Sequence, residues 1–478
     1  MRAKEEALSR ASHALSQLGL PHRLHEFNAY GLRIKRSLFG GSHSVVTYPP
    51  LDSLLPMTQV AFVPPLRFGN RVNLYVHIAF CETQCTFCHY AVKHYRGASH
   101  SSTSKVDFVE RYLEALRREM EVWGALLRES GSVVASIYIG GGTPLVLEQA
   151  RLEQLLADLR REFTVAENAE ICFEGSPLTI VANDGAEKLR WLAQAGITRF
   201  SFGIQSFDDL VLKYAARGYK SDIAFRACEI VAKIFQNWNL DLIQGLYQGS
   251  IDEVWKNLEA LQTIRPPHIT WYHGRFGDRP QGEWLKLAAL RAGFEQERDT
   301  LFGRMLIWQQ LGEMGYDQID GNRFISDRRF IDPFKQIRTS VSHDLLGLGA
   351  SAYSHSADWF VRNTLDVGEY IDRVMSGRLP FTRRRELSSE EKLAASYVID
   401  LRTERWENAQ SDQIYGVHPT ILEHYENLVR ESLGLGLLEE IPLDGGRGLR
   451  LSLLGRLLED EVLSLFYSPS VQQSLRQF

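Results

Sequence analysis

Three cysteines lie within eight residues of this chain, in the stretch CETQCTFC that runs from Cys81 through Cys85 to Cys88. Thiolates at the CxxxCxxC spacing can each bind one iron of a four-iron, four-sulfur cluster, and the motif supplies no fourth ligand. One iron then stays open to bind and reduce a small molecule. A four-cysteine zinc site would need a second CxxC pair, whereas Cys172 and Cys228 are isolated. The spacing therefore favours an iron–sulfur cluster.

An apolar run of strand length precedes the cysteines. Residues 72–80, VNLYVHIAF, are rich in β-branched and aromatic side chains, so the cysteine loop leaves the carboxyl end of a predicted strand. In parallel α/β folds that end of the strands carries the chemistry. Alternation puts His77 on one face with Tyr75, where it is either a packed histidine or a ligand.

Glycine-rich and polar motifs follow the later predicted strands. Gly141 and its neighbours end the apolar run 133–139, and such a turn lets backbone atoms approach a ligand closely. Each polar residue at a strand end also has a structural alternative, since a carboxylate often caps the next helix and a glutamine can satisfy loop backbone. Their order along the chain after a CxxxCxxC motif favours a functional role. These polar residues are Glu174, Gln205, Arg217 and Asp241.

The stretch YVHIAFCETQCTFC resembles the radical SAM superfamily, in detail its branch named for oxygen-independent coproporphyrinogen III oxidase (HemN-like). This resemblance implies that the open iron chelates the amino and carboxylate groups of S-adenosylmethionine (SAM), and that one-electron reduction splits SAM to a 5'-deoxyadenosyl radical. The segments AEICFEGSP, RFSFGIQSF and NLDLIQGL are similar to further motifs of the branch. Residues 345–354, LLGLGASAYS, resemble its SAM-binding loop.

The resemblance also assigns roles to residues. A first, cluster-bound SAM would be contacted by Tyr75, Gly141 and Glu174, and Tyr353 lies in the segment that resembles the SAM-binding loop. His273 and Tyr353 are candidates for the acid or base in proton release. A second SAM would be contacted by Phe87, Gly142, Thr143, Gln205, Arg217 and Asp241.

The reaction is inferred from departures from the family pattern. Coproporphyrinogen oxidases carry a further cysteine where this chain has Tyr90, and haem chaperones begin almost directly at the cluster strand, whereas residues 1–70 precede it here. We therefore expect a HemN-like methylase or cyclopropanase of natural product biosynthesis, which uses two SAM molecules to transfer a one-carbon unit to an sp2 carbon of a conjugated small molecule. The alternatives are an oxidative decarboxylase or modifier of porphyrin or haem, and a haem chaperone.

Alternating strand and helix patterns predict an α/β fold with a partial (β/α)6 TIM-like barrel. At 478 residues and 44% apolar content the chain is too long for one ordinary domain. We expect an N-terminal arm over residues 1–70 that closes the barrel mouth, the barrel over 71–380, and a small winged-helix-like domain over 387–478 after a basic linker, FTRRREL. Strands are expected near 72–79, 133–139, 169–174, 198–204, 238–243 and 267–273, and a pocket wall at 268–280.

The net charge and the hydropathy of the chain limit the classes of partner that we expect. The formal net charge of −5 gives no electrostatic reason to expect nucleic acid or an anionic membrane. The chain has no run of eighteen apolar residues, and its N-terminus lacks the apolar core of a signal peptide. We expect a cytoplasmic protein with a small-molecule substrate and an electron donor such as flavodoxin or ferredoxin.

Overall fold

The computed structural model describes residues 2–19, 47–57, 68–88, 90–246, 251–273, 297–331, 344–402, 406–407, 416–443 and 446–476. All six predicted barrel strands are present, and they pair with one another in parallel and in chain order. This confirms the predicted α/β fold with a partial barrel. The strands are β2 (Arg71–Ile78), β5 (Val133–Gly141), β6 (Val165–Gly175), β7 (Arg199–Gln205), β8 (Trp238–Gln244) and β9 (His268–His273).

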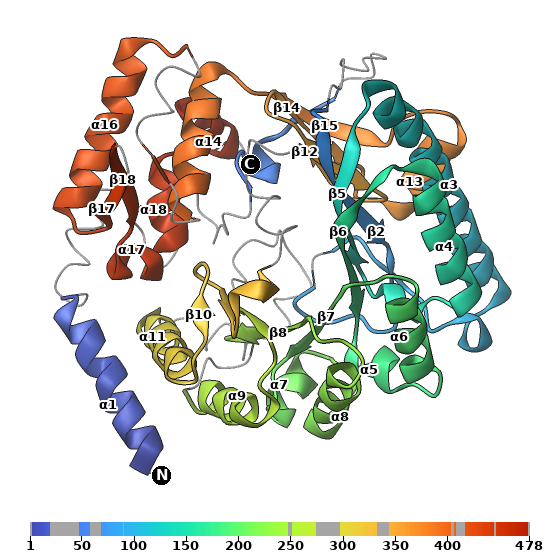
Figure 1. Cartoon of the computed structure of the whole chain (residues 1–478), viewed down its shortest axis with the longest axis horizontal. Helices are drawn as coiled ribbons and strands as arrows, with labels where there is room; N and C mark the ends of the chain where they lie inside the picture. The colour runs from blue at the N-terminus through green and yellow to red at the C-terminus, as the bar shows by residue number, and fades with distance from the viewer. Residues whose placement is uncertain are drawn as a thin grey trace.

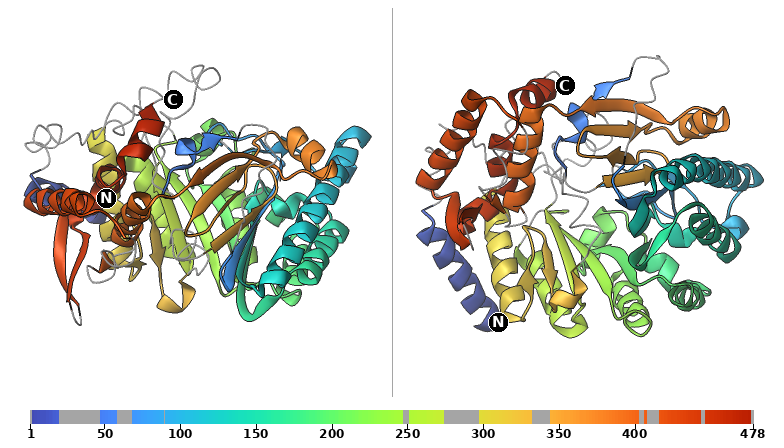
Figure 2. Two further views of the ribbon diagram at one scale, coloured as in Figure 1. Left: turned by 90° about the horizontal axis from the view of Figure 1, so that it is seen from above. Right: turned by 45° about the horizontal axis from the view of Figure 1, so that its top comes forward.

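Helices between these strands cover the outer face of the sheet, as Figure 1 shows. The first of them is α3 (Thr103–Ser130), which buries Leu116, Met120 and Trp123. Leu74 and Val76 of β2 join the same apolar core, so the even-numbered side chains of β2 face the helices. The other covering helices (Figure 2) are α4 (Gln149–Glu162), α5 (Pro177–Val181), α6 (Gly185–Gln194), α7 (Asp209–Tyr214), α8 (Ser221–Ala232) and α9 (Ile251–Ile264).

The inner face of the sheet is polar. Ser136 donates a hydrogen bond to Asn73 at 2.6 Å, and Thr270 donates to Asn239 at 2.9 Å, which in turn donates to Ser201 at 2.9 Å. All five side chains are buried. Because every member has a partner, this inner layer avoids the cost of burying unpaired polar groups. Odd-numbered residues of β2, which share this face, therefore point into the barrel.

The sheet continues beyond the six predicted strands. Within the described residues it has 13 strands, because β12 (Asp344–Leu348) pairs in parallel with β2 and leads into an antiparallel extension. That extension is β13 (Tyr353–His355), β14 (Trp359–Asn363), β15 (Phe381–Glu386) and β1 (Leu55–Pro56), and the other edge carries β11 (Arg323–Ile325) and β10 (Asp317–Gln318).

The basic segment FTRRREL was wrongly predicted to be a linker, because its first six residues are strand β15. The Arg385 guanidinium lies 2.6 Å from a Glu391 carboxylate oxygen, and both side chains are more than nine-tenths buried. Arg385 also donates to the Ser53 carbonyl at 2.8 Å. Its charge is therefore neutralised inside the fold rather than solvated.

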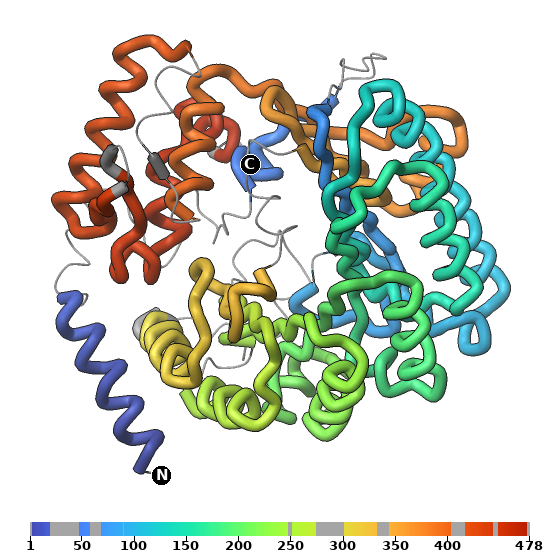
Figure 3. Tube along the Cα trace, viewed as in Figure 1, coloured from blue at the N-terminus to red at the C-terminus, as the bar shows by residue number. Residues whose placement is uncertain are grey.

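N-terminal residues contact segments far along the chain. Helix α1 (Arg2–Gln17) buries Ala7 and Ala11, and its Arg10 pairs with Glu313 of α11 (Glu297–Glu313) at 2.9 Å, so the two helices lie side by side (Figure 3). Tyr48 is buried and donates to Ser468 at 3.0 Å. The predicted closure of the barrel mouth depends partly on residues 20–46, which lie outside the described residues.

The last part of the chain combines helices with a small sheet. Strands β17 (Leu438–Leu443) and β18 (Gly446–Leu451) form an antiparallel pair, beside β16 (Trp406–Glu407). Tyr48 and β1, which precede residue 70, contact segments that follow residue 380. The division of the chain into an N-terminal arm, a barrel and a C-terminal domain, with boundaries at residues 70, 380 and 387, therefore stays a prediction. The helices here are α13 (Val367–Met375), which still belongs to the barrel side, then α14 (Ser389–Arg402), α16 (Pro419–Gly434), α17 (Leu453–Leu457), α18 (Glu459–Leu465) and α19 (Pro469–Arg476).

We predict that Arg385→Ala lowers the free energy of unfolding by roughly 3–5 kcal/mol, because it leaves the Glu391 carboxylate buried without its cation. The neighbouring Arg384 pairs with Glu386 at a more exposed position, so Arg384→Ala should cost less than about 1 kcal/mol. Chemical denaturation followed by circular dichroism measures both. Equal losses in the two variants would contradict a structural role for the buried pair.

Candidate functional site

The cysteine loop lies at the carboxyl end of β2. Cys81 ends the short strand β3 (Phe80–Cys81), and the Cys88 amide donates to the Cys85 carbonyl at 3.2 Å, which closes a tight turn. Cys85 is buried, Cys81 and Cys88 are partly exposed, and none of the three forms a disulfide. Three free thiols on one loop are the donor set that an iron–sulfur cluster requires. In a cluster each thiolate binds a different iron, so the three sulfurs need not converge on one point.

Arg217 connects this loop to β7. Its Nη1 donates to the Cys85 sulfur at 3.0 Å, and its Nη2 donates to the Gly203 carbonyl at 2.5 Å. Its Nε donates to the Tyr219 hydroxyl at 3.1 Å. A guanidinium stays charged at any physiological pH, and its planar set of N–H donors lets it bond to three partners at once. The structure thus brings a predicted SAM-contacting residue to a cluster cysteine.

The glycine triplet lies against the cysteine strand. The Gly142 amide donates to the Ile78 carbonyl at 2.9 Å, and the Thr143 amide donates to the Phe80 carbonyl at 2.7 Å. A Cβ atom on Gly142 would lie 2.2 Å from the Phe80 oxygen, so only glycine allows this approach. The Thr143 hydroxyl then lies 3.0 Å from the Cys81 sulfur.

The Cys81 thiol lies in surroundings that disfavour its charge in the absence of metal. Burial, together with the neighbouring Glu82 carboxylate, raises its pKa to about 12. Iron ligation requires the thiolate, so binding of a cluster would release this proton.

Glu174 lies beside the same glycine turn. Its carboxylate accepts hydrogen bonds from the Tyr138 hydroxyl at 2.5 Å and from the Gly141 amide at 3.1 Å. The ring of Tyr75 stacks on that of Tyr138, with centroids 6.2 Å apart. The structure therefore brings together Tyr75, Gly141 and Glu174, the three residues predicted to contact a first SAM.

His77 is a packed side chain. Burial lowers its pKa to about 4, and its Nε2 lies 3.0 Å from the Ala91 carbonyl. Its Nδ1 lies 3.2 Å from the Tyr75 hydroxyl. The neutral imidazole therefore fixes Tyr75 and the segment after the cysteines, which agrees with the first of the two interpretations from the sequence.

Gln205 ends β7 in a strained conformation. Its φ is +78°, in the left-handed region that side chains other than glycine seldom adopt. A Cβ on Gly203 would lie 2.2 Å from the Gln205 Nε2, so the sequence SFGIQ leaves room for this amide. The buried Gln205 Oε1 has no hydrogen-bond partner among the described residues. Strain and an unpaired buried oxygen at a strand end are typical of a ligand contact.

The other predicted residues lie around this edge of the sheet. Asp241 faces Gly203 across the β7–β8 pairing and accepts from Asn239 at 2.7 Å. Phe87 packs among residues near the ends of β7 and β8. His273 at the end of β9 lies 3.0 Å from the Gln244 Oε1. Tyr353 begins β13, on the far side of β2 in the strand order, and packs with the Tyr75 cluster. His273 and Tyr353, the two candidates for the acid or base, thus belong to β9 and β13, which are far apart in the strand order of the sheet.

A buried network that the sequence analysis missed holds the turn after β12. Glu119 of α3 accepts from the Gly349 amide at 2.8 Å and from the Tyr370 hydroxyl at 2.7 Å. Tyr112 donates to the His77 carbonyl at 2.7 Å and accepts from the Ala350 amide at 3.2 Å. The segment predicted to be a SAM-binding loop is therefore fixed against β2. The sequence feature that could have indicated this network is Glu119 itself, a charged residue on the apolar face of α3.

Gln205 gives a direct test of the strain at this edge. In strands alanine is normally more stable than glycine, but at a positive φ the order should reverse. We predict that Gln205→Gly is about 1 kcal/mol more stable than Gln205→Ala, although both lose the same amide. Thermal and urea unfolding of the two variants measures the difference. Higher stability of the alanine variant would contradict the strained backbone.

Comparison with known proteins supports the predicted resemblance. Residues 75–261 match the family model described as the radical SAM superfamily. A haem chaperone, HemW, of Buchnera aphidicola is 30% identical over 203 residues, which are 42% of this chain and 50% of that protein. The alignment thus spans about half the length of this relative.

Two further comparisons cover more of the chain. The oxygen-independent coproporphyrinogen III oxidase of Bradyrhizobium diazoefficiens is 25% identical over 372 residues, 74% of this chain and 78% of that protein. The structure of coproporphyrinogen III oxidase (HemN) from Escherichia coli superimposes with a TM-score of 0.69 at 22% identity, over 84% of this chain and 90% of the other. This last similarity shows the fold.

The described residues contain no helix that is long and apolar enough to cross a membrane. Radical SAM proteins use a four-iron, four-sulfur cluster and SAM, and the three free thiols, the Arg217 contact and the glycine turn fit that pair of cofactors. Residues 75–261 are therefore similar to the radical SAM superfamily, and the fold of the chain is similar to that of HemN.

Proposed function

We propose that this chain is a radical SAM enzyme whose substrate is a tetrapyrrole, a porphyrin or haem ring that it oxidises or otherwise modifies. The observation that supports this most is the breadth of the similarity to the oxidases. It extends over 74% of the chain in sequence and 84% in fold, well beyond the radical SAM domain itself. The names of both groups of relatives refer to a coproporphyrinogen or to haem.

In this proposal each site residue has a separate task. The cluster, when bound by Cys81, Cys85 and Cys88, supplies one-electron reductive cleavage of SAM. Arg217 positions the Cys85 sulfur through its 3.0 Å contact. Glu174 orders the Gly141 backbone beside the cluster loop, where SAM would bind.

Tyr90 bears on which tetrapyrrole reaction is favoured. It takes the place of the further cysteine expected in coproporphyrinogen oxidases, and its side chain is 56% exposed. A phenol cannot supply thiol chemistry at that position. Modification of a porphyrin or haem is therefore favoured over decarboxylation of a porphyrinogen.

A second candidate function is carbon transfer with two SAM molecules, either methylation or cyclopropanation in natural product biosynthesis. The specific observation in its favour is the strained Gln205, whose buried Oε1 has no partner among the described residues. Gln205, Arg217 and Asp241 belong to the set expected at a second SAM. The candidate ranks second because the relatives reported above are named for haem or a coproporphyrinogen. Haem delivery without turnover of SAM is the third candidate function.

The proposal also includes the cellular setting. A cluster with an open iron needs reducing surroundings, so we propose a cytoplasmic location and a flavodoxin- or ferredoxin-like electron donor.

SAM with a fully deuterated methyl group separates the three functions. We predict that reduced enzyme turning over a tetrapyrrole forms 5'-deoxyadenosine without deuterium, because hydrogen is taken from the substrate. Carbon transfer from a second SAM would place one deuterium in 5'-deoxyadenosine and the remaining label in the product. A haem carrier would bind haem tightly without coupled SAM cleavage. Mass spectrometry of 5'-deoxyadenosine is the measurement, and labelled product during productive turnover would contradict our first choice.

A further inference from the structure

The cluster loop borders a basic surface that the proposed SAM chemistry does not use. Residues 91–105, AVKHYRGASHSSTSK, contain Lys93, Arg96 and Lys105 but no aspartate or glutamate, in a chain whose formal net charge is −5. All three side chains belong to exposed residues, as do His94 and His100. Positive charge is therefore concentrated on one segment directly after the cysteines.

This segment is fixed to the cluster loop by backbone pairing. Strand β4 (Lys93–His94) pairs in parallel with β3, so that His94 stands opposite Cys81. The Lys93 amide donates to the Ala79 carbonyl at 2.8 Å, and the Tyr95 amide donates to the Cys81 carbonyl at 2.9 Å. Neighbouring strands lie about 4.8 Å apart, so the basic surface is one strand away from a cluster ligand.

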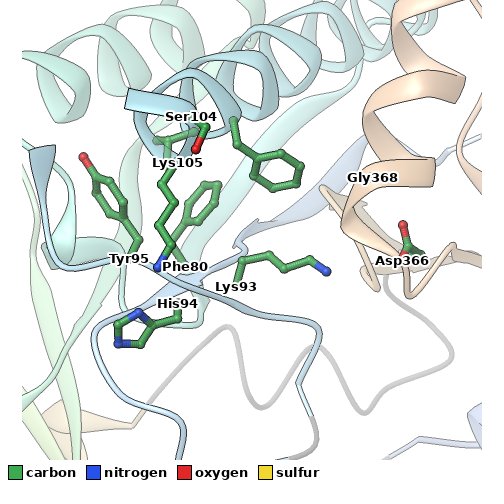
Figure 4. Close-up of a pocket in the computed structure, with 10 residues that line it drawn as sticks. Phe80, Lys93, His94, Tyr95, Ser104, Lys105, Asp366 and Gly368 are labelled. Atoms are coloured by element: carbon green, nitrogen blue, oxygen red, sulfur yellow. The ribbon is translucent and has the colours of Figure 1, made fainter. Parts of the chain in front are cut away.

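A cavity of about 430 Å³ opens in this surface, between β4 and the starts of α3 and α13. Figure 4 shows Lys93, His94 and Lys105 around it, with Asp366 on the side of α13. Phe80, the residue before Cys81, forms part of its apolar wall. A partner side chain inserted here would contact lysines at its rim and the cluster strand behind them.

Among the residues that line the cavity, two lysines, Lys93 and Lys105, stand against one carboxylate, Asp366. Glu148 and Glu110 lie nearby, and both pair with Arg151. Asp366 caps α13 by accepting from the Glu369 amide at 2.8 Å, and it is the carboxylate among the residues that line the cavity. The lining of the cavity itself therefore has one more lysine than carboxylate.

We propose that this surface is the docking site of an acidic one-electron carrier protein that reduces the cluster. The inference rests on the proposed radical SAM function, which requires one electron for each SAM cleaved. Electron transfer weakens steeply with distance, so a carrier must dock beside the cluster loop. Transient redox complexes are small, and complementary charge speeds their encounter. A basic rim one strand from Cys81 meets both needs, and the acidic partner follows from its charge.

Charge reversal tests the proposal with two reductants. The double variant Lys93→Glu/Lys105→Glu is assayed for 5'-deoxyadenosine formation, once with reduced flavodoxin and once with dithionite, which needs no docking surface. We predict that the flavodoxin-driven rate falls roughly tenfold or more at low salt, while the dithionite-driven rate stays within about twofold. Salt should slow the flavodoxin-driven wild-type reaction far more than that of the variant.

The matched control reverses two exposed charges far from the cysteine loop, Arg226→Glu on α8 and Lys233→Glu at its C-terminal cap. Its flavodoxin-driven rate should equal that of the wild type. Full flavodoxin-driven activity in the Lys93/Lys105 variant would overturn the docking site, as would equal loss with both reductants, which would indicate local misfolding. If the wild type cleaves no SAM even with dithionite, the proposed function itself fails and the docking site fails with it.

Discussion

The close approach of two strand ends organises this site. Amides of Gly142 and Thr143 donate to the carbonyls of Ile78 and Phe80, which carry the chain into the cysteine loop. A side chain on Gly142 would collide with the Phe80 oxygen. These two backbone hydrogen bonds set the distance between the cysteine loop and the glycine turn.

Two further sets of contacts, one from α3 and one from Arg217, fix the segments around the cysteine loop. Glu119 and Tyr112 of α3 hold the turn after β12 against the carboxyl end of β2. From the other side, Arg217 connects Cys85 to the Gly203 carbonyl of β7. Both arrangements use charged or polar groups that are buried and fully engaged, which makes the position of the cysteine loop specific at the cost of desolvation. The cysteine loop is thus fixed from more than one side of the barrel.

Much of this arrangement could be predicted from local patterns, and some could not. The six barrel strands appear as apolar runs, and their ends carry Cys81, Gly141 and Glu174, because parallel strands finish at one edge. The contact between Arg217 and Cys85 joins residues 132 positions apart, and no periodicity predicts it.

Other features could not be predicted from the sequence, because they depend on residues distant in the chain or on the backbone conformation. The sequence predicts that Arg385 belongs to a solvated linker. The Glu391 carboxylate that neutralises its charge and the Ser53 carbonyl that accepts its hydrogen bond lie beside it only in the folded protein. The strain at Gln205 is a property of φ, which the sequence does not display. The assignment of that residue came from family resemblance, whereas its unpaired amide oxygen became visible only in the structure.

The central claim is that Cys81, Cys85 and Cys88 hold a cluster with one open iron beside the glycine turn. Electron paramagnetic resonance of the anaerobically reconstituted, reduced protein, recorded with and without SAM, tests it most directly. We predict about four irons per chain and a cluster signal that shifts when SAM binds the open iron. Alanine at any of the three cysteines should remove that signal, while Cys172→Ala and Cys228→Ala should keep it. An intact signal in one of the three variants, or a wild-type signal that SAM leaves unchanged, would contradict the account.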